Sequence, residues 1–339
     1  MTLTGQVGQL LMVGVPSSSP SQAAGLIRSE RVGGVFLHGR TTTSATGLAS
    51  RLASLQRLAR RTSGVGVDIG VDQEGGQVRL LRGPGFVQLP SASVQGTWTA
   101  AELAARTAAS ARSLRAGGIT MNLAPVADVV PAGTAADNPP IGRLQRQYGS
   151  TPGAVAADVG VVVRASRSAG VQTAAKHFPG LGRVRVNTDF SAGAVDTRTT
   201  ASDPALGPFG AAISAGTDAV MISLASYPGL DPDNIAAFSP SIVTGLLRER
   251  MGYGGVVMSD DLGAAKAVTA VPAGRRAVRF VAAGGDIVLT VDPSTARAMQ
   301  QGLLAEATRS LSFRTTVARA VERVLLGKAH AGLLRCSAG

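Results

Sequence analysis

Short apolar runs recur along the chain and alternate with segments of helical periodicity. Each run is 6 to 11 residues long and is rich in Val, Ile, Leu or Met. Continuous apolar runs of this length are typical of strands buried on both faces of a parallel sheet. The eight runs are Gln9–Pro16, Val32–His38, Gly64–Val71, Ile119–Val129, Val171–His177, Asp218–Ala225, Gly254–Ser259 and Asp286–Val291.

The segments between these runs carry apolar residues at helical spacing. Thr99 and Ser239 precede two of them as capping residues, and glycines end others, as at Gly117 and Gly170. The predicted helices between runs include Ala45–Arg61, Ala100–Ala116, Pro152–Ser168, Ser239–Arg250 and Arg275–Ala283. Two further helices, Ser294–Ala307 and Phe313–Leu326, follow the last run.

This alternation predicts an α/β fold with a parallel sheet and right-handed crossovers. Eight strands also close a barrel, so we predict a (β/α)8 TIM barrel, with a doubly wound open sheet as the alternative. Residues 1–330 then form one domain, in which the last helix is an addition covering the outside of the barrel. We expect the chain to fray from Gly327 onward and residues 331–339 to be a flexible tail.

The N-terminal apolar run does not have the flanks of a secretory signal. No basic segment precedes Leu10–Val15, and no small-residue cleavage site follows it at a suitable distance. No apolar run reaches the roughly 18 residues that cross a bilayer. We therefore expect a first strand here, a cytoplasmic protein and no membrane partner.

The formal charge of +12 changes this picture little. All but three of the 33 basic residues are arginine, which is typical of coding bias, and the arginines are scattered among few aromatic residues. This distribution does not favour a nucleic-acid partner. One cysteine, Cys336, and three histidines also argue against a disulfide framework or a zinc site. We expect no metal and no other cofactor.

Charged residues follow several of the predicted strands. Asp72 and Glu74 follow the third run, Asp128 ends the fourth, Lys176 and His177 end the fifth, and Asp260 and Asp261 follow the seventh. The carboxyl ends of barrel strands open onto one face, where barrel enzymes have their active sites. A charge next to a buried strand is costly unless it is paired or functional, so these positions predict a site.

Each position also has a structural alternative. Asp72 or Glu74 could cap the next segment, Asp128 could belong to a turn before Pro131, and Lys176 could pair with Asp128 or Asp72. His177 could be a hydrogen-bonded core histidine. Asp261 is expected to be structural, because strand alternation turns it away from Asp260.

The chemistry that fits these residues is carbohydrate binding. Carboxylates and cations in a concave mouth can bind several hydroxyls, and glycoside cleavage needs a carboxylate and a proton donor on opposite sides of the bond. No phosphate-binding glycine motif and no Gly-x-Ser-x-Gly elbow are present in the sequence.

Several motifs resemble those of the β-N-acetylhexosaminidase branch of glycoside hydrolase family 3. Asp72–Arg79 resembles the DQEGGRV signature, and Lys176–Gly180 is identical to KHFPG. Four more segments are similar to family motifs in family order: Asn122–Asp128 (N-[FL]-A-P-V-x-D), Ile141–Gly149 (IG…RSFG, with longer spacing), Tyr227–Ser239 (YP.LD…FS) and Ser259–Leu262 (SDDL).

The resemblance implies a retaining glycosidase that removes terminal, non-reducing β-linked N-acetylglucosamine through a covalent glycosyl-Asp intermediate. It implies Asp260 as the nucleophile. The sugar-binding residues that it implies are Asp72, Asp128, Arg146, Lys176 and His177. Relatives of this single-domain type often act in cytoplasmic recycling of cell-wall fragments.

The chain departs from the family at the acid/base. There a D-S-H triplet supplies a catalytic His and its partner Asp, whereas this chain has Asn187, Thr188 and Asp189. We expect Asp189 to replace the His on a glycine-containing mobile loop, and the alternative is that Asp189 only caps a turn with Thr188 and Ser191. On the same loop, Arg183 and Arg185 would oppose protonation of Asp189 unless they point outward or meet an acidic aglycone.

Three functions therefore remain open. The first is a hydrolase with Asp189 as its acid/base. The second is a related family 3 enzyme for another sugar, or a transferase or phosphorylase, although a carboxylate near the reaction centre would repel an attacking phosphate. The third is a non-catalytic sugar-binding homologue.

Overall fold

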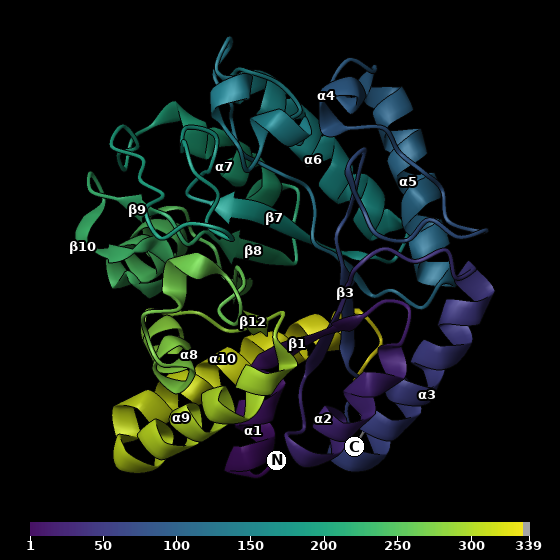
Figure 1. Cartoon of the computed structure of the whole chain (residues 1–339), viewed down its shortest axis with the longest axis vertical. Helices are drawn as coiled ribbons and strands as arrows, with labels where there is room; N and C mark the ends of the chain where they lie inside the picture. Colours follow the sequence, from purple (N-terminus) through teal and green to yellow (C-terminus); the bar gives the residue numbers. More distant parts are fainter. Residues whose placement is uncertain (335–339) are drawn as a thin grey trace.

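A computed structural model describes residues 1–334, and its centre is a barrel of eight parallel strands in chain order (Figure 1). Each of the eight predicted runs contains one strand, which confirms the predicted α/β barrel. The strands are β1 (Leu11–Pro16), β2 (Gly34–His38), β3 (Asp68–Val71), β6 (Met121–Asn122), β7 (Gln172–Phe178), β8 (Ala219–Ile222), β11 (Val256–Ser259) and β12 (Val288–Thr290). β12 pairs with β1, and a bridge between Met258 and Ile287 joins β11 to the β12 segment, so the barrel is nearly closed.

Helices surround this barrel (Figure 1). They are α2 (Ala23–Ser29), α3 (Ala45–Ser63), α5 (Ala100–Ala116), α6 (Pro152–Ser168), α7 (Gly207–Ser214), η6 (Ser241–Arg250), α8 (Ala273–Ala282) and α9 (Ala296–Arg309). The predicted caps are present: the Thr99 hydroxyl accepts from the Glu102 amide at 3.2 Å, and the Ser239 hydroxyl accepts from the Ile242 amide at 3.1 Å. Helix α1 (Leu3–Gln9) precedes β1, where the sequence predicted only a strand.

Short elements decorate the loops. Two hairpins, β4 (Gln73–Gly75) with β5 (Val78–Arg79) and β9 (Ser226–Tyr227) with β10 (Asp231–Ile235), follow β3 and β8. The remaining single turns are α4 (Ala92–Gln95), η1 (Pro20–Gln22), η2 (Ala135–Asp137), η3 (Gly142–Leu144), η4 (Pro204–Leu206), η5 (Ala236–Phe238), η7 (Lys266–Val268) and η8 (Pro293–Thr295).

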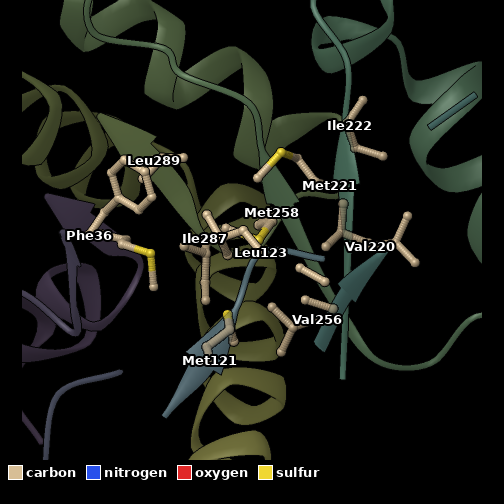
Figure 2. Packing of buried hydrophobic residues seen from close by; sticks show 14 of the residues in the cluster. Phe36, Met121, Leu123, Val220, Met221, Ile222, Val256, Met258, Ile287 and Leu289 are labelled. Carbon is tan, nitrogen blue, oxygen red and sulfur yellow. The ribbon is translucent and has the colours of Figure 1, made fainter. Parts of the chain in front are cut away.

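Apolar side chains fill the inside of the barrel (Figure 2). One set comes from alternate strands, the second, fourth, sixth and eighth of the barrel: Phe36, Leu123, Met221 and Leu289. Four side chains from alternate strands form one layer of a TIM-barrel core. This layer also lines the cavity described below, so the core of the barrel is the floor of the site.

Helix α10 (Leu311–His330) closes the other end of the barrel. Lys328 is fully buried, and its ammonium group donates to the Gln9 side chain at 2.7 Å and to the carbonyls of Gly33 at 2.6 Å and Gly66 at 3.0 Å. Gly33 and Gly66 lie just before β2 and β3, so the helix crosses the N-terminal mouth. The expectations that it covers the outside and frays from Gly327 are therefore wrong, because Lys328 fastens it to these strand starts.

Part of the predicted flexible tail is also packed. Leu333 is buried, its carbonyl accepts from the Gly66 amide at 2.9 Å, and its amide donates to the Lys328 carbonyl at 2.9 Å. The rest of that tail, residues 335–339, lies outside the described residues. Among residues 1–334, none of the helices has the length and apolar character that a bilayer crossing requires.

Lys328 provides a stability test. Burial lowers the pKa of Lys328 to about 8, and the negative charge of nearby Asp68 acts in the other direction and raises it. Lys328→Met would leave three buried acceptors without a donor, so we expect a loss of about 3 kcal/mol or more in the free energy of unfolding by denaturant, at about 1–3 kcal/mol for each unsatisfied group. Lys266→Met, at an exposed lysine, should change it by less than about 0.5 kcal/mol. Equal effects of the two substitutions would show that Lys328 does not fasten α10.

Candidate active site

A cavity of about 400 Å³ lies at the carboxyl ends of the strands. Six of the seven predicted site residues line it: Asp72, Arg146, Lys176, His177, Asp189 and Asp260. They come from the ends of β3, β7 and β11 and from the loops after β6 and β7. Convergent polar groups above an apolar floor are typical of a small-molecule site.

Glu74 holds two cations of this cavity in place. Its buried carboxylate accepts from Arg146 through two hydrogen bonds, of 2.9 and 2.7 Å, and lies 2.7 Å from the Lys176 ammonium. Burial alone would raise the pKa of Glu74, but the charges of Arg146 and Lys176 outweigh it and lower that pKa to about 2. Glu74 therefore stays ionised and orients both cations.

Lys176 is also tied to Asp72. Its ammonium lies 2.5 Å from the Asp72 carboxylate, which is partly exposed to the cavity. Burial acts to lower the pKa of Lys176, but Asp72 and Glu74 raise it above its ordinary value. Lys176 and Asp72 therefore form the ion pair that the sequence analysis considered as an alternative. This ion pair lies on the cavity wall.

His177 is held in one orientation from both ring nitrogens. Nδ1 lies 2.7 Å from the Asp128 carboxylate, and Nε2 lies 3.3 Å from Arg146 Nη2. Because a guanidinium group only donates, Nε2 is the acceptor of that bond, and Nδ1 carries the proton donated to Asp128. The neutral tautomer of His177 is therefore assigned by its two partners.

Asp128 occupies a different place from the one predicted for a sugar-binding residue. It is fully buried and does not line the cavity. Its carboxylate accepts from the His177 amide at 3.2 Å and from the Leu181 amide at 2.7 Å, in addition to the imidazole. All of these partners lie in one segment, so Asp128 positions His177 and the start of the following loop instead of meeting the ligand.

The two adjacent aspartates after β11 both border the cavity, but they differ in their hydrogen-bond partners. Asp260 lines the cavity and accepts the Asp261 amide at 2.8 Å. The buried Asp261 carboxylate accepts from the amides of Gly263 and Val291 at 2.8 Å and of Ala264 at 3.0 Å. Asp261 thereby joins the loops after β11 and β12, which leaves Asp260 as the carboxylate available to a ligand.

Asp189 reaches the cavity on the tip of a turn that other residues stabilise. The Asn187 side chain accepts from the Asp189 amide at 2.9 Å, and the Asn187 carbonyl accepts from Phe190 and Ser191. Within residues 1–334 no hydrogen bond forms to the Asp189 carboxylate itself. The alternative that Asp189 caps this turn is therefore wrong, because Asn187 caps it.

Two backbone hydrogen bonds dock this turn onto the segment after β11. The Lys266 amide donates to the Asp189 carbonyl and the Ala267 amide to the Thr188 carbonyl, both at 3.1 Å. Since Asp260 directly follows β11, this docking brings the turn to the Asp260 side of the cavity.

The surroundings of Asp189 favour a protonated carboxyl. Desolvation by the surrounding protein raises its pKa to about 6, repulsion from Asp260 adds to this shift, and the positive charge of Arg146 opposes it. The carboxyl keeps an exposed side at the mouth, where solvent screens part of this effect. Arg183 pairs with Asp203 and Arg185 lies 3.9 Å from Asp137, so both arginines are directed away from this cavity.

The family model for the glycosyl hydrolase family 3 N-terminal domain matches residues 2–326 of the chain. The chain belongs to glycoside hydrolase family 3. It is a glycosidase built on the barrel of this family.

Relatives of this family 3 chain span most of its length. A β-hexosaminidase of Stenotrophomonas maltophilia is 33% identical over 84% of both chains. The crystal structure of a β-N-acetylhexosaminidase from Beutenbergia cavernae is 42% identical, with a TM-score of 0.93 over 97% of this chain and 99% of that one. A family 3 β-N-acetylglucosaminidase from Paenibacillus is 31% identical, with a TM-score of 0.87 over 100% of this chain and 65% of that one.

Glu74 is a residue of this family 3 site to which the sequence analysis, although it noted the charge after the third strand, gave no binding or catalytic role. The signal was present, because Glu74 lies three residues after a strand buried on both faces. Its cationic partners are 72 and 102 positions away in sequence, and that pairing is visible only in the folded barrel. No group of three or more metal-ligating side chains occurs in the described part of the chain, residues 1–334.

Asp128→Asn tests the positioning of His177 in this glycosidase. An amide nitrogen facing Nδ1 would disfavour the present tautomer, and losing this charge-assisted bond should lower kcat/KM roughly ten- to hundredfold. The fold should persist, because the Asn carbonyl can still accept from the Leu181 amide. The matched control is Asp218→Asn, which removes a half-buried charge at the opposite end of the barrel and should affect stability alone. Similar kcat/KM losses in both variants would contradict a positioning role.

Proposed function

We propose that this family 3 glycosidase removes terminal, non-reducing β-linked N-acetylglucosamine with retention of configuration. The observation that carries the proposal is that two carboxyl groups, Asp260 and Asp189, face one cavity in different surroundings. A retaining glycosidase needs such a pair, one to attack the anomeric carbon and one to protonate the leaving oxygen.

In the first step the Asp260 carboxylate attacks the anomeric carbon, while Asp189 donates its proton to the glycosidic oxygen. The bond to the aglycone breaks, and a glycosyl ester forms on Asp260. In the second step the ionised Asp189 takes a proton from a water molecule. The water oxygen attacks the anomeric carbon, and the ester bond to Asp260 breaks. Asp189 is then protonated again, and free sugar leaves.

Four polar residues would bind the terminal sugar before this chemistry: Asp72, Arg146, Lys176 and His177. Asp72 can accept from hydroxyls, and Lys176 and Arg146 can donate to them, as Glu74 keeps both cations in place. The apolar layer of Phe36 and its three partners offers a surface to the C–H groups of the sugar. Because these groups are held before the ligand arrives, little reorganisation is needed on binding.

The named relatives support N-acetylglucosamine as the sugar. Asp189 disfavours phosphorolysis, because its carboxylate would repel an attacking phosphate in the second step.

Replacing each aspartate after β11 tests the assignment of the nucleophile. Asp260→Ala should lower turnover of 4-nitrophenyl N-acetyl-β-glucosaminide at least about a thousandfold. Asp261→Ala should mainly lower stability, since it leaves buried amides without an acceptor. A slow 5-fluoro glycosyl fluoride should leave a covalent adduct on Asp260, detected by peptide mass spectrometry. An adduct on another residue would refute the assignment.

Replacing Asp189 tests the proton donor. Asp189→Ala should lose far more kcat/KM on N,N′-diacetylchitobiose, a poor leaving group, than on the 4-nitrophenyl glycoside, which needs little protonation. Azide should rescue the variant and yield a glycosyl azide of retained configuration, because azide needs no general base. In the wild type, kcat/KM on the disaccharide should fall as the pH rises through about 6, because Asp189 then loses its proton.

Asp137→Ala, at an exposed carboxylate outside the cavity, is the matched control and should leave both substrates unaffected. Equal losses on both substrates in Asp189→Ala, without rescue by azide, would exclude Asp189 as the acid/base.

A further inference from the structure

Phe190 is an exposed phenylalanine at the mouth of the cavity. The other seven phenylalanines of the chain are buried, with at most 7% of each exposed, whereas 82% of Phe190 is exposed. It follows the proposed acid Asp189 directly and lines the same cavity. An aromatic ring left in water beside a binding cavity indicates a surface that a ligand covers.

The ring is presented by the turn that presents the acid. The Phe190 amide donates to the Asn187 carbonyl at 3.1 Å, and the preceding residue is docked by Lys266 onto the segment after β11. The backbone that carries Asp189 and Phe190 is therefore held by the same hydrogen bonds. A general acid lies beside the glycosidic oxygen, so the residue next to it on the solvent side lies beside the aglycone.

We propose that Phe190 is the platform of an aglycone subsite that takes a neutral pyranose. This inference rests on the proposed function and specifies its substrate as a glycoside whose aglycone is itself a sugar. The face of a β-linked gluco-configured ring is made of axial C–H groups, whose hydrogens are weakly positive and are attracted to the negative face of an aromatic ring.

The neighbouring groups favour an uncharged aglycone. The segment after β11 contributes Asp260, Asp261, Ala264 and Ala265 to the cavity wall, and neither Arg183 nor Arg185 lines the cavity. Both arginines instead line a separate cavity of about 310 Å³. The cations that line this cavity, Arg146 and Lys176, are already paired with Glu74, and two further carboxylates line the wall near Phe190, so this lining favours a neutral pyranose over an acidic aglycone.

The test compares two substrates that share the terminal sugar and differ in the aglycone. N,N′-diacetylchitobiose has a pyranose aglycone, whereas N-acetyl-β-glucosaminyl fluoride has a single atom. Phe190→Ala should lower the ratio of kcat/KM for the disaccharide to kcat/KM for the fluoride about three- to tenfold. Phe190→Trp should restore the ratio to the wild-type value or above, and Phe190→Leu should give an intermediate value.

Leu311→Ala is the matched control, because Leu311 is 81% exposed on remote α10, and it should leave the ratio unchanged. An unchanged ratio in Phe190→Ala would overturn the proposal. So would a change in sedimentation on Phe190→Ala without a change in the ratio, since the ring would then cover a contact between two copies of the chain.

A calorimetric measurement separates this proposal from the proposed function. If the wild type hydrolyses neither substrate, the function fails, but the platform still predicts that Phe190→Ala weakens binding of the disaccharide more than that of N-acetylglucosamine. Equal weakening of both would overturn the platform alone.

Discussion

The active site depends on the ion pairs that the buried Glu74 carboxylate forms with Arg146 and Lys176. A buried charge is tolerated only when it is paired and hydrogen-bonded, and Glu74 meets this condition by drawing Arg146 and Lys176 into the cavity wall. Lys176 then holds Asp72, and Arg146 holds the imidazole of His177. A neutral sugar that enters the cavity meets donors and acceptors already oriented, which is the main source of electrostatic stabilisation in enzymes.

The barrel separates the groups that serve the ligand from those that hold the fold. At the carboxyl ends of the strands, charges pair around a cavity whose floor is the last apolar layer of the core. At the opposite end, Lys328 and the pair of arginines on Asp286 fasten α10 and the strand starts. The loop after β7 is held at two places: Asp128 accepts from the Leu181 amide near its start, and amides of the segment after β11 donate to its tip.

The strands were predictable because each is an uninterrupted apolar run, and the long helices because their apolar faces repeat over several turns. Helices α1, α2 and α7 were not predicted, since segments of 7 or 8 residues carry too little periodicity. Polar strand ends located the site, but the inward turn of Asp128 and the placement of α10 arise from contacts between distant segments. The role of Asn187 as the cap of the turn was also not predictable, because it depends on the conformation of the folded loop.

The most direct test of Asp189 as proton donor is the titration of its own carboxyl carbon. The protein would be labelled with ¹³C at aspartate Cγ, and the resonance assigned by its absence in Asp189→Asn. We expect an apparent pKa of about 6 in the wild type, and a lower pKa in Asp260→Asn, where the repulsion from Asp260 is removed. A pKa in the usual range of an exposed aspartate, unchanged by Asp260→Asn, would contradict this role.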